Sequence, residues 1–182
     1  MPKNTSEKIG LWTKENISKL VETHRFPLLY FITSIVGNIT DAEDIVEDTF
    51  ARLIFKKPRL KNPDAAKTYL FVTAKNIATD YLRKMQRKRK QLDELSRFSD
   101  KEIELIEDKI CQTETHRELT AAFNALPTEM RQILYLQYFE NLTPREIAKV
   151  TGKSVKYIYN QTARGKKALA EKLEKENNTH EN

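Results

Sequence analysis

The chain has 182 residues, of which 39% are hydrophobic and 32% are charged, and its net charge is +6. With only 4 Gly and 6 Pro, a turn-rich β fold is disfavoured and an all-α fold is expected. A single cysteine excludes an internal disulfide, and one Cys with three scattered His argues against a metal site. No signal peptide and no apolar run of membrane-spanning length is visible. We therefore expect a cytoplasmic protein with no cofactor, no metal and no membrane insertion.

Charge is distributed unevenly along the chain and divides it into blocks. Residues 1–90 carry a net charge of +8, residues 91–118 carry −5, and residues 119–182 carry +3. Two basic blocks around an acidic one predict two polyanion-binding units joined by a linker. We expect helical domains at 1–90 and 119–175, a flexible acidic linker between them, and a disordered tail at 176–182.

The first block begins with apolar residues at helical spacing between Leu11 and Ile35. Pro27 is expected to open a second helix within this stretch, because proline is favoured in a first helical turn. Gly37 and Asn38 are expected to end that helix.

The next helix begins with Thr40 and Glu43, which have the spacing of a capping box. One of its faces is apolar and comprises Ala42, Ile45, Val46, Thr49, Phe50 and Leu53. Its other side collects carboxylates near the N-terminus, where the helix dipole favours negative charge. This acidic side is either an ordinary solvated helix start or a docking surface for a partner with a basic face.

A basic loop at 56–66 precedes a helix that ends in RKMQRKRK, where six of eight residues are cations. Leu70, Ala74, Ile77 and Tyr81 form its inward stripe, and Asn76, Asp80, Arg83 and Arg87 its outward one. Such a density of like charge is costly unless a polyanion neutralises it, although a solvated helix end is the alternative. Tyr81 could stack on an unpaired base, but its helical spacing favours a place in the core.

The C-terminal block predicts helices at 117–126 and 128–142, separated by Pro127, and then a helix-turn-helix. Thr143 with Glu146 forms a capping box, Gly152 can take a positive φ at the turn, and Ser154 caps a second helix. That helix is rich in basic and hydrogen-bonding side chains, as expected of one that enters the major groove. The alternative is a plain helical hairpin with a solvated basic face.

Three segments together resemble the extracytoplasmic-function class of RNA polymerase sigma factors. DAEDIVEDTFARLI is similar to the region 2 helix that binds the clamp of the polymerase β′ subunit. YLFVTAKNIATDYLRKMQRKRK is similar to the region 2 helix that opens and reads the −10 element. The segment from ALPTEMRQ to RGKKAL is similar to region 4, which reads the −35 element. The segments occur in the order of that family and cover most of the chain.

The resemblance implies three sets of site residues. Polymerase would bind at Asp41, Asp44, Glu47 and Asp48. The −10 element would contact Lys56, Lys57, Arg59, Lys61, Asn62, Lys75, Asn76, Arg83, Lys84, Arg87 and Lys88. The −35 element would contact Arg145, Lys153, Ser154, Lys156, Tyr157, Tyr159, Asn160, Arg164, Lys166 and Lys167. The chain departs from the family at Tyr159 and Gln161, where Arg or Lys is frequent, so no relative's promoter sequence can be transferred.

The function that the resemblance implies is that of an initiation factor, not an enzyme. It would bind core RNA polymerase through the β′ clamp and the β flap, and direct it to promoter DNA. An anti-sigma protein is a further candidate partner, because factors of this class are often held inactive by one. The competing interpretation is a self-sufficient helix-turn-helix repressor, which would need neither a second basic helix nor an acidic docking helix. An enzyme is the third alternative, since the sequence has no phosphate loop, metal cluster or nucleophile–base pair.

Overall fold

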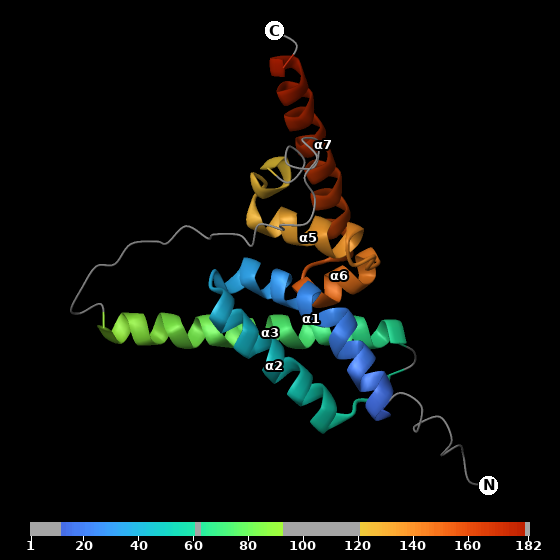
Figure 1. Ribbon diagram of the computed structural model, residues 1–182. Coiled ribbons are helices and arrows are strands. Elements are labelled where there is room, and N and C mark those ends of the chain that lie inside the picture. Colours follow the sequence, from blue (N-terminus) through green and yellow to red (C-terminus); the bar gives the residue numbers. More distant parts are fainter. Residues whose placement is uncertain (1–11, 61–62, 93–120, 181–182) are drawn as a thin grey trace. The chain divides into compact units, whose positions relative to one another are not determined.

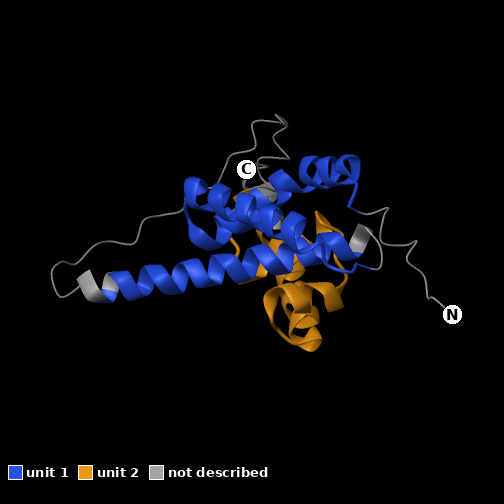
Figure 2. Ribbon diagram, turned by 90° about the horizontal axis from the view of Figure 1, so that it is seen from below, with its two compact units in different colours: residues 1–105 blue, residues 106–182 orange. Residues whose placement is uncertain are grey.

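The computed structural model describes residues 12–60, 63–92 and 121–180, and these residues form helices and connecting turns (Figure 1). The chain divides into two compact units, residues 1–105 and residues 106–182 (Figure 2). The boundary between the units lies within the expected linker at 91–118, most of which is outside the described residues. The all-α fold class predicted from the sequence is therefore confirmed.

The described residues of unit 1 form three helices, each of which packs against the other two: α1 (Lys14–Val36), α2 (Ile39–Lys56) and α3 (Pro63–Leu92). The core contains Leu28, Ile32, Leu53 and Leu70, which are fully buried. Phe31 and Phe71 meet edge to face with their ring centroids 5.4 Å apart, an arrangement that aromatic pairs prefer. The C-terminal part of α3 extends past the other two helices (Figures 1 and 2).

Pro27 does not open a helix, contrary to the prediction, but lies inside the 23-residue helix α1. Proline removes one backbone hydrogen bond from a helix interior, and α1 changes direction partway along its length (Figure 1). The residues just after Pro27 are buried, and their packing maintains the helix across this defect. The predicted end of the helix is confirmed, because Gly37 adopts a φ of 76° and its N–H donates to the Thr33 carbonyl.

The start of α2 also differs from the prediction, because Asn38 caps it in place of Thr40. The Asn38 side-chain oxygen accepts hydrogen bonds from the N–H groups of Thr40, at 2.8 Å, and Asp41, at 3.2 Å. Asn and Thr are both good N-caps, so the sequence contains two candidate N-cap residues, Asn38 and Thr40. The apolar face predicted for this helix is confirmed, since all six of its residues are buried.

The basic loop is shorter than the predicted range of 56–66. Helix α2 includes Lys56, and α3 already begins at Pro63, whose fixed φ suits a first helical turn. Lys57 ends α2 with a φ of 41°, in the left-handed region that non-glycine residues seldom occupy.

Unit 2 contains a helical segment at 121–124, then α5 (Thr128–Tyr138), α6 (Pro144–Thr151) and α7 (Val155–His180). Its core includes Leu126, Met130 and Leu134, with Phe123 and Leu169 packed against them. Helix α5 ends at Tyr138, four residues before the predicted end, because Asn141 takes a φ of 54° and the Leu142 N–H bonds back to the Leu136 carbonyl.

The C-terminal end of α7 also differs from the prediction. The helix continues through His180, whereas a disordered tail was expected from residue 176. Lys and Glu dominate residues 171–176, and both are good helix formers, so helical structure can continue there on polar sequence.

Candidate functional site

The acidic residues of α2 lie on the side of the helix that faces away from the core of unit 1. Asp44 and Glu47 are exposed, and Asp41 and Asp48 are partly buried. Asp48 forms an ion pair with Arg52 one turn further along, at 2.9 Å. Both side chains of this pair are almost half exposed, so water screens it and it stabilises the helix only slightly.

A groove of about 500 Å³ runs between α2 and α3, and it brings together two of the predicted site sets. Its α2 wall is mainly acidic and carries Asp41, Asp44 and Asp48, together with Arg52, the ion-pair partner of Asp48. Its α3 wall is mainly basic and carries Arg83, Lys84 and Arg87, together with Asp80. Ile45, Ile77 and Tyr81 supply the apolar part of the lining. The groove therefore presents carboxylates and cations to the same volume. The charge pattern of each helix in the sequence does not show that the two helices face each other.

This groove corrects the predicted inward stripe of α3. Leu70 and Ala74 are buried as predicted, but Ile77 and Tyr81 are only partly buried because they line the groove. All four members of the outward stripe are exposed, as predicted.

The remaining residues predicted to contact the −10 element are spread over two parts of unit 1. Lys56, Lys57 and Arg59 are exposed at the end of α2 and in the loop that follows. Lys61 and Asn62 lie outside the described residues. On α3, Asn76 and Lys88 are exposed, but Lys75 is partly buried. The cations of α3 extend through Lys90 on the part of the helix that passes beyond α1 and α2 (Figure 1).

The helix-turn-helix of unit 2 forms as its local signals predicted. The Thr143 N–H donates to the Glu146 carboxylate at 2.9 Å, and the Thr143 hydroxyl accepts from the Glu146 N–H. Gly152 ends α6 with a φ of 74°. Ser154 then caps α7 by accepting from the Tyr157 N–H at 3.2 Å.

One side of α7 packs on the rest of unit 2 and the other side is exposed. The packed side contains Ile158, which is fully buried, and Thr162, whose hydroxyl donates to the Gln137 side-chain oxygen at 2.7 Å. Gly165 completes that side and is also buried. The exposed side carries most of the predicted −35 set, namely Lys156, Tyr159, Asn160, Arg164, Lys166 and Lys167; Ser154 and Arg145 are exposed nearby.

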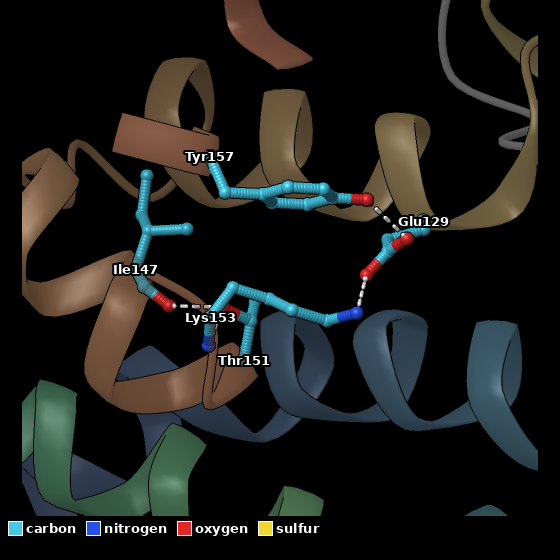
Figure 3. A network of polar contacts seen from close by, with 5 residues as sticks. All are labelled: Glu129, Ile147, Thr151, Lys153 and Tyr157. Atoms are coloured by element: carbon cyan, nitrogen blue, oxygen red, sulfur yellow. Dashed lines mark hydrogen bonds and ion pairs between the residues drawn. The ribbon is translucent and has the colours of Figure 1, made fainter. Parts of the chain in front are cut away.

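Two members of the −35 set, Lys153 and Tyr157, are engaged inside unit 2 by Glu129 of α5 (Figure 3). The Lys153 ammonium lies 2.8 Å from one oxygen of the Glu129 carboxylate. The Tyr157 hydroxyl donates to the other oxygen at 2.7 Å. The same ammonium lies 5.1 Å from the centroid of the Tyr157 ring, within the range of a cation–π contact.

The ionisation of the three groups follows from this arrangement. Hydrogen bonds from Lys153 and then from Tyr157 lower the pKa of Glu129, because they stabilise its carboxylate. The hydrogen bond to Glu129 raises the pKa of Lys153 and also that of Tyr157, because it stabilises their protonated forms. Glu129 is not among the site residues predicted from the sequence, because it is 28 residues from Tyr157 and belongs to no motif shared with it.

Two features are absent from the part of the chain that the structure describes. No group of three or more His, Cys, Asp or Glu side chains there is arranged to hold a metal ion. Of the helices described, none combines the length and the apolar character needed to cross a bilayer.

Comparison with known families matches both units. The family model described as sigma-70 region 2 matches residues 20–89, which cover most of unit 1. The model described as sigma-70, region 4, matches residues 116–169, which include α5, α6 and the first half of α7.

Curated relatives and solved structures agree with these matches. RNA polymerase sigma factor SigV of Bacillus subtilis is 28% identical, over 90% of this chain and 95% of that protein. ECF RNA polymerase sigma factor SigX of the same organism is 23% identical, over 88% of this chain and 85% of that protein. Among solved structures, the sigma factor RpoE from Bartonella quintana, crystallised with the anti-sigma factor NepR, has a similar fold. Its TM-score is 0.65 at 17% identity, over 88% of this chain and 98% of that one. CnrH, in complex with the cytosolic domain of CnrY, gives a TM-score of 0.54 at 21% identity, over 89% of this chain and 90% of that one.

Proposed function

The chain belongs to the sigma-70 family of RNA polymerase sigma factors, in its extracytoplasmic-function class, and directs transcription initiation at promoters; from this premise we propose which surface performs each task. Helix α2 docks core RNA polymerase through Asp41, Asp44, Glu47 and Asp48. The cations of α3 and of the preceding loop contact the opened −10 element. Helix α7 reads the −35 element.

The observation that carries this division is that acidic and basic surfaces occur together in unit 1, whereas the recognition helix belongs to unit 2. A basic partner is attracted to the α2 carboxylates, and single-stranded DNA is attracted to the exposed cations of α3. The exposed Asn160 and Arg164 are of the types that make bidentate contacts with adenine and guanine in the major groove. Docking and upstream recognition are therefore expected to be separable by mutation.

The deciding experiment compares two double variants with wild type. Asp44→Lys with Asp48→Lys places like charge against a basic partner and leaves the buried face of α2 intact, so affinity for core polymerase should fall. Asn160→Ala with Arg164→Ala should preserve that affinity and relax the preference for the −35 element, at about 1–3 kcal/mol per base contact. The measurements are core-enzyme affinity and transcription from promoters with intact or scrambled upstream elements.

A matched control separates docking from net charge. Glu15→Lys with Glu22→Lys makes the same change in charge at exposed carboxylates of α1, outside the proposed surface, so polymerase affinity should remain near that of wild type. If this control loses as much affinity as the Asp44/Asp48 variant, or if both double variants lose both properties equally, the proposed division is wrong.

We also propose how the factor fits into its cellular setting. Polymerase supplies the catalysis, so this chain acts as a regulatory subunit in the cytoplasm. Bartonella quintana RpoE, which shares the fold, was crystallised with an anti-sigma factor, which supports a protein antagonist for this chain as well. Purification from the native host under resting and stressed conditions should reveal a partner besides the polymerase subunits; recovery of polymerase alone in both states would contradict an antagonist.

A further inference from the structure

Lys153 occupies the turn directly before α7, where cations of a helix-turn-helix protein commonly meet DNA phosphates. Its ammonium group, however, is turned toward α5 and lies 2.8 Å from the Glu129 carboxylate. Figure 3 shows the Lys153 side chain extended beneath the Tyr157 ring, with its end directed at Glu129.

Both oxygens of the Glu129 carboxylate have a donor in this arrangement, one from the turn and one from the first turn of α7. The backbone around Lys153 is held as well. The Lys153 backbone N–H donates to the Thr151 hydroxyl oxygen, with 3.4 Å between nitrogen and oxygen, and that hydroxyl donates to the Ile147 carbonyl at 2.8 Å (Figure 3). The carboxylate therefore connects α5 to the beginning of α7 at two points.

Charge balance favours this arrangement even when DNA approaches. A Lys153 side chain that moved to a phosphate would leave the Glu129 carboxylate uncovered, about half exposed and beside a polyanion. Tyr157 cannot compensate for the lost cation, because a neutral hydroxyl supplies no charge. If the Glu129–Lys153 ion pair stays intact, the two side chains together present no net charge to the DNA.

We infer that Glu129 is a positioning residue for the recognition helix: it withholds Lys153 and Tyr157 from DNA and fixes the start of α7, so that Lys156, Tyr159, Asn160 and Arg164 make the contacts. This inference rests on the proposed function, in which α7 reads the −35 element. It assigns Lys153 and Tyr157 a role inside the protein, in place of the DNA contact that the family resemblance implied.

The test counts phosphate contacts by the salt dependence of promoter binding, with the full chain bound to core polymerase. Each lost phosphate contact should reduce the slope of log K against log salt by about 0.9. The double variant Glu129→Gln with Lys153→Gln keeps the net charge of wild type, and its slope should equal that of wild type. Glu129→Gln alone releases Lys153 toward the phosphates, so its slope should be steeper by up to about 0.9.

Tyr157→Phe supplies an independent readout on sequence preference. A side chain that reads a base relaxes specificity at one promoter position when it is removed. A residue that only fixes the start of α7 should relax it at several positions of the −35 element, with the salt slope unchanged. Single-base substitutions across that element distinguish the two patterns.

The inference is overturned if the Glu129/Lys153 double variant shows a slope reduced by about 0.9, because Lys153 would then contact a phosphate in the complex. A loss confined to one position in Tyr157→Phe would overturn it for Tyr157. Lys156→Gln serves as the reference and should reduce the slope by about 0.9, while Arg164→Ala should relax specificity at one position. If neither reference variant has an effect, the proposed function of α7 has failed, and not the role of Glu129.

Discussion

Gly165 lies inside a helix, where glycine is usually unfavourable, and its missing side chain permits close approach of α7 to α5. A β-carbon added at this position would lie 2.8 Å from a Leu134 methyl carbon and 3.0 Å from the Met130 γ-carbon. Leu134 is 1% exposed and has little room to move. The glycine thus stands immediately beside Arg164, one of the proposed base-reading residues, and sets how closely that part of α7 lies to the core.

Gly165→Ala is therefore expected to destabilise unit 2 although it improves helix propensity. Overpacking a core costs about 1–3 kcal/mol, and replacing Gly by Ala in a helix recovers about 1 kcal/mol, so a net loss of about 1 kcal/mol is expected. Denaturant unfolding followed by circular dichroism measures it. Ala163→Gly, at an exposed position two residues earlier, isolates the propensity effect. A stabilised Gly165→Ala protein would show that the close approach does not constrain the helix.

His24 is buried in unit 1, and its Nδ1 has no hydrogen-bond partner among the described residues. Burial lowers the pKa of His24 below its usual value of 6.5, and the positive charge of Lys67 lowers it further. The folded state consequently binds a proton less readily than the unfolded state does.

The stability of unit 1 should therefore fall as the pH drops below about 6.5, because the unfolded state gains its proton first. The loss continues until the pH passes the lowered pKa of the folded state, and above about pH 7 this contribution is fully present. Trp12, the single tryptophan, lies in unit 1, so its fluorescence can follow the melting of that unit. His24→Gln should flatten the dependence of Tm on pH between 7 and 5, whereas His116→Gln should not. An equally steep dependence in the His24 variant would assign the effect to other groups.

At the scale of elements, the groove between α2 and α3 brings together charged side chains of both signs from unit 1. Its α3 wall includes Arg83, which pairs with Asp80 three residues earlier, at 3.3 Å, with both side chains 67% exposed. A pair this exposed is weak and leaves the guanidinium accessible to phosphate. The cations of this wall are therefore well placed for single-stranded DNA.

Arg83→Gln with Lys84→Gln should weaken open-complex formation and reduce the salt slope by about 0.7 per lost phosphate contact, the value for single strands. Lys14→Gln with Lys19→Gln removes the same charge from exposed positions of α1 and should leave the slope near that of wild type. Binding of the polymerase complex to a premelted promoter at several salt concentrations provides the measurement. A slope unchanged in the Arg83/Lys84 variant would mean that these residues are only a solvated helix end.

Structural features that depend on residues close in the sequence could be predicted, whereas features that depend on contacts between distant segments could not. The capping box of Thr143, the left-handed Gly152 and the buried face of α2 depend on neighbours within one or two helical turns, and all were predicted from the sequence. The uninterrupted course of α1 through Pro27 was not, because burial after the proline decides it. The groove and Glu129 depend on contacts between helices, for which a single sequence carries no local signal.

At the scale of the whole molecule, the two units have separate cores, and each contains its own proposed DNA contacts. The expected linker at 91–118 remains a prediction, since nearly all of it lies outside the described residues. Because each unit buries apolar side chains of its own, we expect the two to unfold independently.

Independent unfolding predicts that damage to one unit leaves the other unchanged. Circular dichroism follows both helical units, so the unfolding of unit 2 appears there as a transition that Trp12 fluorescence does not share. Gly165→Ala should lower that transition and leave the Trp12 fluorescence transition where it was. Leu53→Ala, at a fully buried position, should shift the Trp12 transition, leave the unit 2 transition where it was, and cost unit 1 about 2–5 kcal/mol. A single transition that moves as a whole in both variants would show that the units are coupled.

The separation of α7 into a packed side and an exposed side has a consequence for evolution and for engineering. Tyr159 and Asn160 project away from the core, so they can be exchanged with little effect on folding, whereas Thr162 and Gly165 cannot. If α7 reads the −35 element as proposed, new promoter preferences can arise by drift at the exposed positions while the scaffold is retained. A library restricted to those positions would then be a practical route to variants of this factor with altered promoter preference.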